Sequence, residues 1–157
     1  MNTKYAGLIK NDMVNGEGVC VSFWTQGCPH RCPGCHNPET WDFDGGMEVP
    51  TDIKGQIIKA ISANGVERNF SVLGGEPLCP ENIELTCSVI TAVRAAYPDI
   101  KIYLWTGYTF NALPLCDELA KIIEKIDYLI EGPYIEKLRD ITLPLIGSSN
   151  QTIIHLT

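Results

Sequence analysis

Three cysteines lie close together in the segment GCPHRCPGC, residues 27–35, with the spacing C-x3-C-x2-C: Cys28, Cys32 and Cys35. Thiolates this close in the chain can bind one compact metal centre. Neither a further cysteine nor a carboxylate follows at matching spacing, and a four-ligand site needs one more donor. The spacing therefore leaves open what completes the coordination of the metal.

Three interpretations of this loop are compatible with its composition. Free thiols clustered on a loop invite oxidation, which makes unliganded cysteines the weakest of the three. Structural zinc, with His30 or His36 as fourth ligand, usually pairs two short ligand segments, whereas this chain has one. A [4Fe–4S] cluster takes four thiolates, and held by three it keeps one iron open. The spacing therefore favours an iron–sulfur cluster with an open iron.

The overall composition is that of an ordinary globular chain. Its 157 residues are 45% hydrophobic and 20% charged, which predicts one domain over residues 1–157. A signal pattern and a bilayer-length apolar run are both missing, so we expect a cytoplasmic protein without a membrane partner. The net charge of −7 and the scattered Lys and Arg residues argue against nucleic-acid binding. The other four cysteines are expected to be bystanders rather than disulfide partners: Cys20, Cys79, Cys87 and Cys116.

Segments typical of strands alternate with segments typical of helices. We expect strands at residues 19–25, 70–73, 100–105, 127–132 and 151–156, and helices at residues 51–63, 81–97 and 115–126. This alternation predicts an α/β fold with a parallel sheet and right-handed crossovers. A complete eightfold barrel takes about 250 residues. The chain is too short for one, so we expect an open sheet or a partial barrel.

Distinctive loops follow the first three predicted strands. They are the cysteine loop, the run Gly74-Gly75-Glu76-Pro77, and the run Thr106-Gly107-Tyr108. Two glycines after a strand are often only a turn, but glycine also lets the backbone approach a ligand closely. Ligands of open parallel sheets bind beyond the carboxyl ends of the strands. We therefore expect the three loops to form one site.

The cysteine loop, placed just after the first predicted strand of a βα protein, resembles that of the radical S-adenosylmethionine (SAM) enzymes. In that family the amino and carboxylate groups of SAM chelate the open iron. Further motifs follow in a fixed order: Asp12-x-Val14-Asn15-Gly16-x-Gly18, the cysteine segment through Thr40-Trp41, Gly74–Pro77, Trp105–Tyr108 and Gly147-Ser148-Ser149-Asn150-Gln151. Together, from about residue 12 to the C-terminus, they resemble the activating proteins of anaerobic ribonucleoside-triphosphate reductase.

Two positions bear on this resemblance. Many radical SAM enzymes have an aromatic residue just before the last cysteine, whereas this chain has Gly34. Glycine is normal there in the reductase-activating subfamily. That subfamily often has Arg before the Gly-Ser-Ser-Asn-Gln run, where this chain has Ile146. A contact made by that guanidinium is therefore not carried over to this chain.

The resemblance implies a partial βα barrel of the radical SAM type and a set of site residues. The [4Fe–4S] cluster would bind Cys28, Cys32 and Cys35, and SAM would lie against Gly34, Cys35, His36, Gly74, Gly75 and Glu76. Glu76 or backbone carbonyls of its loop would accept hydrogen bonds from the methionyl ammonium. Asn150 and Gln151 either cap a turn or contact a ligand or partner. His30 is expected to be structural, and Trp41 and Trp105 to be packing residues.

The resemblance also implies a reaction and its partners. The enzyme would cleave SAM reductively and generate a glycyl radical on the catalytic subunit of the anaerobic reductase. Reduced flavodoxin or a similar protein would donate the electron. The nearest alternative is an activase of another glycyl radical enzyme, such as pyruvate formate-lyase. The alternative outside this chemistry is a zinc-stabilised binding module.

Overall fold

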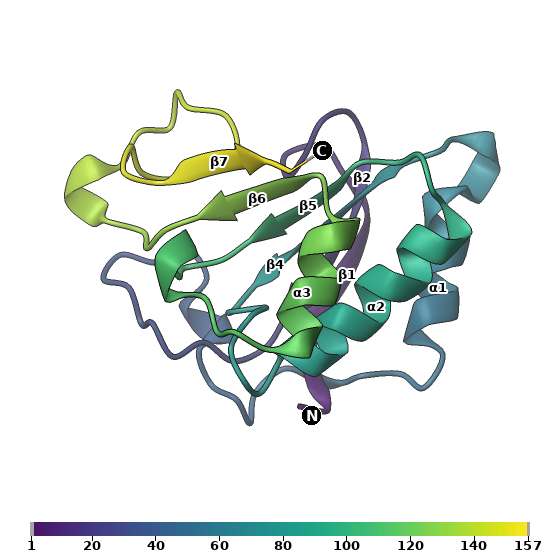
Figure 1. The fold of residues 1–157 in the computed structure, drawn as a ribbon, viewed down its shortest axis with the longest axis horizontal. Coiled ribbons are helices and arrows are strands. Elements are labelled where there is room, and N and C mark those ends of the chain that lie inside the picture. Colours follow the sequence, from purple (N-terminus) through teal and green to yellow (C-terminus); the bar gives the residue numbers. More distant parts are fainter. Residues whose placement is uncertain (1, 157) are drawn as a thin grey trace.

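The computed structural model describes residues 2–156 and is built around one seven-stranded sheet. The strands are β1 (Lys4–Asp12), β2 (Cys20–Thr25), β3 (Met47–Glu48), β4 (Asn69–Gly74), β5 (Ile102–Trp105), β6 (Tyr128–Glu131) and β7 (Thr152–His155). The helices are α1 (Ile53–Ile61), α2 (Ile83–Ala96) and α3 (Asp117–Lys125), with short 3-10 turns at Pro38–Thr40, Ala63–Gly65, Phe110–Ala112 and Glu136–Leu138. Figure 1 shows the three helices over one face of the sheet.

The strand order explains why the helices share a face. The order is β3-β1-β2-β4-β5-β6-β7, and β2, β4, β5 and β6 run parallel as neighbours. Because these four strands advance in one direction across the sheet, crossovers of one hand place α1, α2 and α3 on the same side. The outer strands β1, β3 and β7 are antiparallel to their neighbours. The expected parallel sheet is confirmed for its four central strands, and the fold is mixed α/β.

Side chains alternate between the two faces of the central strands, as the pleat requires. Toward the helices, the strands contribute to one apolar core: Val21, Phe23, Phe70, Val72, Ile102 and Leu104. The residues between them face the opposite side, and Trp24, Leu73 and Trp105 there line a cavity. The helices cover the first face only, so the second face is available for a ligand site.

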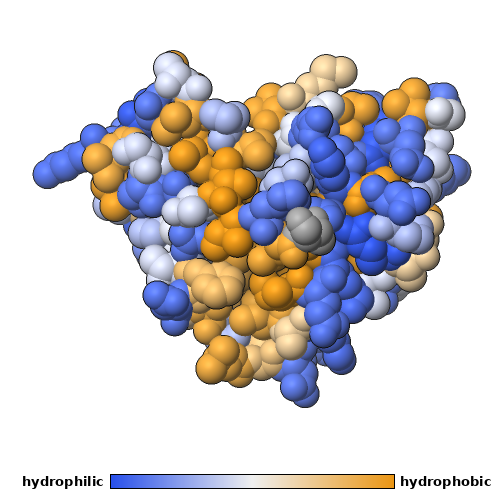
Figure 2. All heavy atoms as spheres, turned by 45° about the horizontal axis from the view of Figure 1, so that its top comes forward, coloured by the Kyte–Doolittle hydropathy of each residue, from blue (hydrophilic) through white to orange (hydrophobic). Residues whose placement is uncertain are grey.

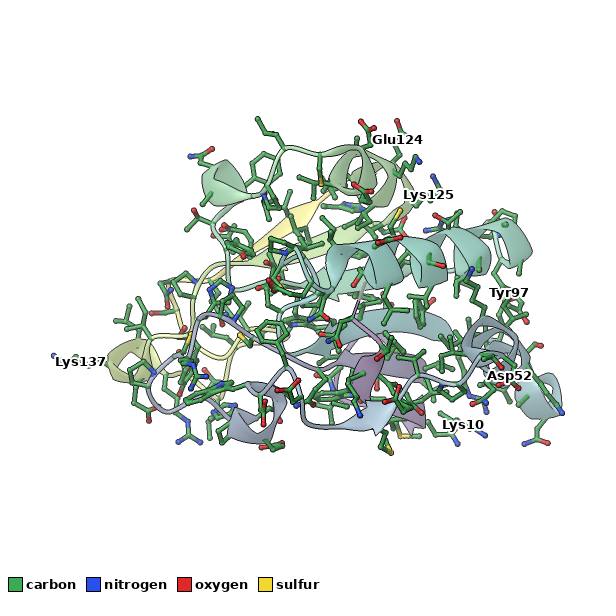
Figure 3. All side chains as sticks on the ribbon, turned by 90° about the horizontal axis from the view of Figure 1, so that it is seen from below. Lys10, Asp52, Tyr97, Glu124, Lys125 and Lys137 are labelled. Carbon is green, nitrogen blue, oxygen red and sulfur yellow. The ribbon has the colours of Figure 1, made fainter. Side chains whose placement is uncertain are left out.

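Two segments cover part of the second face. The loop at residues 13–19 crosses it, and the amide of Glu17 donates to the Tyr103 hydroxyl at 3.2 Å. The segment at residues 133–149 reaches it from the other side, where Trp105 Nε1 donates to the Leu145 carbonyl at 2.8 Å. Figure 3 shows Lys137 of this segment at one end of the molecule, with Lys10 and Tyr97 near the opposite end.

All five predicted strands and all three predicted helices are present, with ends shifted by a few residues. Two strands were not predicted, β1 and β3, which extend the sheet beyond β2. None of the helices in residues 2–156 is long and apolar enough to cross a bilayer. Figure 2 shows apolar side chains gathered in the middle of the face that it draws. Leu115 and Ile153 are among the exposed large hydrophobic residues of the protein.

Candidate functional site

The cysteine loop leaves the carboxyl end of β2 and is closed at its base by backbone hydrogen bonds. The amide of Gly27 donates to the Thr40 carbonyl at 2.7 Å, and the amide of Cys28 donates to the Trp41 carbonyl at 3.1 Å. Within the loop, the Cys35 amide donates to the Cys32 carbonyl at 3.0 Å. These bonds fold residues 27–41 into a compact loop whose three cysteines line one cavity of about 580 Å³.

Backbone amides point at two of the cysteine sulfurs. The Asn37 amide donates to Cys35 Sγ at 3.4 Å. Burial raises the pKa of the Cys28 thiol to about 11, although hydrogen bonds from the amides of His30 and Arg31 act in the opposite direction. In the metal-free protein the Cys28 thiol is therefore protonated at neutral pH, and metal binding must release its proton.

The loop after β4 packs directly against the cysteine loop. The Gly75 amide donates to the Thr25 carbonyl and the Glu76 amide to the Gly27 carbonyl, both at 2.9 Å. A Cβ on Gly75 would lie 2.4 Å from the Gly27 oxygen, and one on Gly74, where φ is +110°, would lie 2.6 Å from the Thr25 backbone. The two glycines are thus required for the contact between two loops, a reason that the sequence alone did not reveal.

Asn82 holds the same two loops together from beneath. Its side chain is fully buried, and its Nδ2 donates to the carbonyls of Gln26, Gly27 and Glu76 at 3.0–3.2 Å. Sequence reasoning missed this residue, because an asparagine just before a helix is usually read as a helix cap.

The Glu76 carboxylate is fully buried and accepts four hydrogen bonds within the protein. Its Oε1 lies 2.7 Å from His30 Nε2 and 2.7 Å from the Gly107 amide. Its Oε2 accepts from the Thr106 hydroxyl at 2.8 Å and from the Leu78 amide at 2.9 Å. The carboxylate therefore connects the cysteine loop with the loops after β4 and β5, and all three loops line the cavity, as the sequence predicts.

The last part of the cysteine loop contacts the segment after β6. The ring of His36 lies 5.1 Å from that of Tyr134, and the Tyr134 hydroxyl donates to Glu136 Oε2 at 3.0 Å. Gly34 has a φ of +76°, and a Cβ there would lie 1.8 Å from the same Glu136 oxygen. The absence of a side chain at Gly34 thus leaves room for the Glu136 carboxylate.

Asn150 and Gln151 hold the turn that precedes β7. Gln151 Oε1 accepts from the amides of Gly147 and Ser148, and its Nε2 donates to the Gly132 carbonyl. Asn150 Nδ2 donates to the Pro133 carbonyl at 2.7 Å. Of the two side chains, that of Gln151 lines the cavity. The turn-capping interpretation therefore describes both residues in this structure.

The opposite wall of the cavity is largely apolar, and the sequence did not assign it to a site. It comes from the loop after β1 and from the segment after β6, through Val14, Ile141, Leu143, Leu145 and Ile146. Ile141 is 82% exposed and Val14 is 79% exposed, so the wall continues onto the surface. Ile146, the residue just before the Gly-Ser-Ser-Asn-Gln run, thus contributes an aliphatic side chain to the wall.

Both tryptophans that were expected to pack also line the cavity. Trp105 fixes the segment after β6 through Leu145. The Trp41 indole N–H is buried and has no hydrogen-bond partner among residues 2–156. Arg31 lies over the Trp41 ring, 5.8 Å from its centroid. Trp24 and Trp105 could have been found from the alternation of their strands, since both belong to the face opposite the helices.

The side chains of Cys28, Cys32 and Cys35 line the same cavity. A closed zinc site needs four ligands within about 2.3 Å of one point. In the described part of the chain, His, Cys, Asp and Glu side chains form no group of three that could hold a single ion. Cys20, Cys79 and Cys87 are buried and Cys116 is partly buried, and all four lie outside the cavity lining.

Comparison with known proteins indicates a [4Fe–4S] cluster. Residues 14–154 match a protein family described as a 4Fe-4S single cluster domain. The anaerobic ribonucleoside-triphosphate reductase-activating protein of Escherichia coli K12 is 34% identical, with 92% of this chain and 94% of that protein covered. Proteins of the same name from Haemophilus influenzae, 34% identical over 96% of both chains, and from phage T4, 31% identical over 90% of this chain and 87% of that protein, are also similar. The chain therefore belongs to the family of anaerobic ribonucleoside-triphosphate reductase-activating proteins.

Proposed function

We propose that this protein is a radical SAM activase that generates a glycyl radical on anaerobic ribonucleoside-triphosphate reductase. The observation that carries the proposal is the donor set. Cys28, Cys32 and Cys35 line one cavity beyond the strand ends, and the lining contains no fourth thiol from residues 2–156. A [4Fe–4S] cluster held by these three residues would keep one iron open for SAM. When bound, the cluster would supply the electron for reductive cleavage of SAM, and this cleavage drives radical formation on the glycine.

The residues that we propose to contact SAM surround the three cysteines. Cys35, His36, Gly74, Gly75 and Glu76 line the cavity, and Gly34 adjoins it. Because the Glu76 carboxylate already accepts four hydrogen bonds, we assign the methionyl ammonium to backbone carbonyls of its loop. Gln151, which also lines the cavity, is the proposed polar contact to the ligand or partner from the last turn, with Asn150 supporting that turn.

The partner would approach from the apolar wall. The exposed Val14 and Ile141 side chains extend the apolar wall of the cavity onto the surface, and we propose that the partner contacts them when its glycine reaches the cavity. A reaction of this class uses no side-chain acid or base, and the buried carboxylate of the cavity, Glu76, already accepts four hydrogen bonds within the protein. Reduced flavodoxin or a similar protein is the proposed electron donor, and the cytoplasm the proposed location.

We also propose that the fold is the incomplete barrel of the radical SAM enzymes, formed by residues 1–157 as one domain. Four adjacent parallel strands with all helices on one face support this interpretation, since the same arrangement continued would close into a barrel. One apolar core beneath the helices supports a single domain.

The test uses protein purified without oxygen and reconstituted with iron and sulfide. We expect about four irons per chain, release of 5′-deoxyadenosine from SAM after reduction, and a glycyl signal in electron paramagnetic resonance when the reductase is added. Cys32→Ala should abolish SAM cleavage, whereas the matched variant Cys87→Ala, outside the cavity, should retain it. Stoichiometric zinc in colourless protein, or a glycyl signal on pyruvate formate-lyase but not on the reductase, would refute the proposal.

A further inference from the structure

We propose that the contact between His30 and Glu76, here called the clasp, fixes the cysteine loop against the loop after β4. In this role Glu76 is a positioning residue and not a SAM ligand. The inference rests on the proposed function for the identity of the two ligands. The clasp itself is a feature of the polypeptide. Its two members come from loops that follow different strands, β2 and β4.

The first argument is the saturation of a buried carboxylate. Glu76 is 0% exposed, and each of its oxygens accepts two hydrogen bonds at 2.7–2.9 Å. In the His30 tautomer that carries its N–H at Nε2, the imidazole donates to Oε1 and all four contacts are hydrogen bonds to the carboxylate. With four donors in place, the lone pairs of the carboxylate are all used, and an ammonium group could bind only if one of the present hydrogen bonds broke. The carboxylate therefore serves as an acceptor for groups of the protein itself.

The second argument is that two residues of the loop after β5 pack against the imidazole. The His30 ring packs edge-on against Tyr108, with the ring centroids 4.6 Å apart. Gly107 also lies close to the ring, and a Cβ there would come within 2.6 Å of it. The glycine of the loop after β5 therefore makes room for the imidazole. His30, Glu76 and Gly107 form one packed unit in which the ring has a single place.

The consequence concerns the distance between the two ligand-binding loops. The cysteine loop has backbone hydrogen bonds at its base, whereas His30 lies between Cys28 and Cys32 in the sequence, two residues from each of these proposed cluster ligands. Without the clasp, this part of the loop would lose its side-chain connection to Glu76. A SAM molecule must contact an iron and the loop after β4 at once, so a misplaced cysteine loop would weaken SAM binding.

The test begins with cluster-free protein, which needs no activity. In Glu76→Gln, amide hydrogen–deuterium exchange in residues 27–36 and 104–110 should accelerate at least about tenfold. The side-chain NH2 of Gln is a donor, so it would face two donors that a carboxylate oxygen of Glu76 accepts in the wild type. His30→Ala should accelerate the same segments, and His30→Gln, which retains an N–H donor, should restore most of the protection. Asp127→Asn is the matched control, since its carboxylate accepts from Arg94 and Ile102 near the opposite ends of the strands.

The second measurement uses the reconstituted enzyme. We expect His30→Ala and Glu76→Gln to raise the KM for SAM by a similar factor, about tenfold or more, with the double variant no worse than either single variant. Loss of SAM affinity in Glu76→Gln alone, with His30→Ala like wild type, would show that Glu76 is a SAM ligand and overturn the clasp. Unchanged exchange in both variants would overturn it as well. Wild-type protein that binds no SAM would instead refute the proposed function, and the exchange experiment would still test the clasp.

Discussion

The contact between Gly75 and Gly27 can be tested by adding one methyl group. In Gly75→Ala the new Cβ would lie 2.4 Å from the Gly27 carbonyl oxygen and 3.0 Å from that of Thr40. Both are backbone atoms of the closed cysteine loop and cannot rotate away. The two loops would have to separate by about an ångström. Overpacking of this kind typically lowers the free energy of unfolding by about 1–3 kcal/mol. That movement would also break the 2.9 Å bond from the Glu76 amide to the Gly27 carbonyl, worth about 0.5–1.5 kcal/mol.

The expected loss is therefore about 2–4 kcal/mol in the free energy of unfolding. With a urea dependence of about 2 kcal/mol per molar, the unfolding midpoint of the cluster-free protein should fall by about 1–2 M. Gly55→Ala is the matched control, because a Cβ at that exposed position of α1 meets nothing within 4 Å. Its midpoint should rise by about 0.3–0.5 M, since alanine favours helix. A midpoint of Gly75→Ala equal to that of wild type would refute the reasoning.

Two further predictions concern the walls of the cavity. Asp12→Asn should lose about 1–3 kcal/mol of stability at pH 7, because four hydrogen bonds hold this buried carboxylate. Burial raises the pKa of Asp12, but bonds from Asn15, Val14 and Ser22 outweigh burial and hold the pKa below its ordinary value. The stabilisation is therefore present above the unfolded-state pKa, and the gap between Asp12→Asn and wild type in urea unfolding should narrow as pH falls below about 4. Ile141→Asp should raise the reductase concentration needed for half-maximal glycyl radical formation by about tenfold. Leu115→Asp, at a position that is also exposed but lies outside the cavity, should not, and equal effects of both would contradict the assignment of the apolar wall.

The predictability of the fold follows from how regular each element is. The strands β2, β4, β5 and β6 are short and apolar, and each is bounded by a glycine-rich or polar loop. β1 was not predicted, because its pairing with β2 shifts register between Tyr5 and Gly7 and again between Ile9 and Asp12. Such irregularities break the two-residue period on which a strand pattern depends. β3 has two residues, too few for any period.

The predictability of the site follows from whether a residue acts through its own type or through a distant neighbour. Cysteine spacing and the glycines after β4 are local patterns, and they led to the cavity. The contact between His30 and Glu76 joins residues 46 positions apart, and neither side chain carries a local signal for it. The apolar wall has the same character, because Ile141 belongs to an irregular segment whose position depends on the bond from Trp105 to Leu145.

The two walls of the cavity are fixed in different ways, and this difference bears on how a large partner protein could bind and dissociate. Around the cysteines, Asn82 and Glu76 hold three loops together through buried hydrogen bonds, so the fold itself sets the positions of these loops. The opposite wall is held to the sheet through Trp105 and ends in exposed aliphatic side chains. The proposed reaction transfers a hydrogen atom and needs a fixed radical source, whereas the proposed partner that supplies the hydrogen must enter and leave. Rigid polar packing on one side and an exposed apolar margin on the other meet these two needs with one cavity.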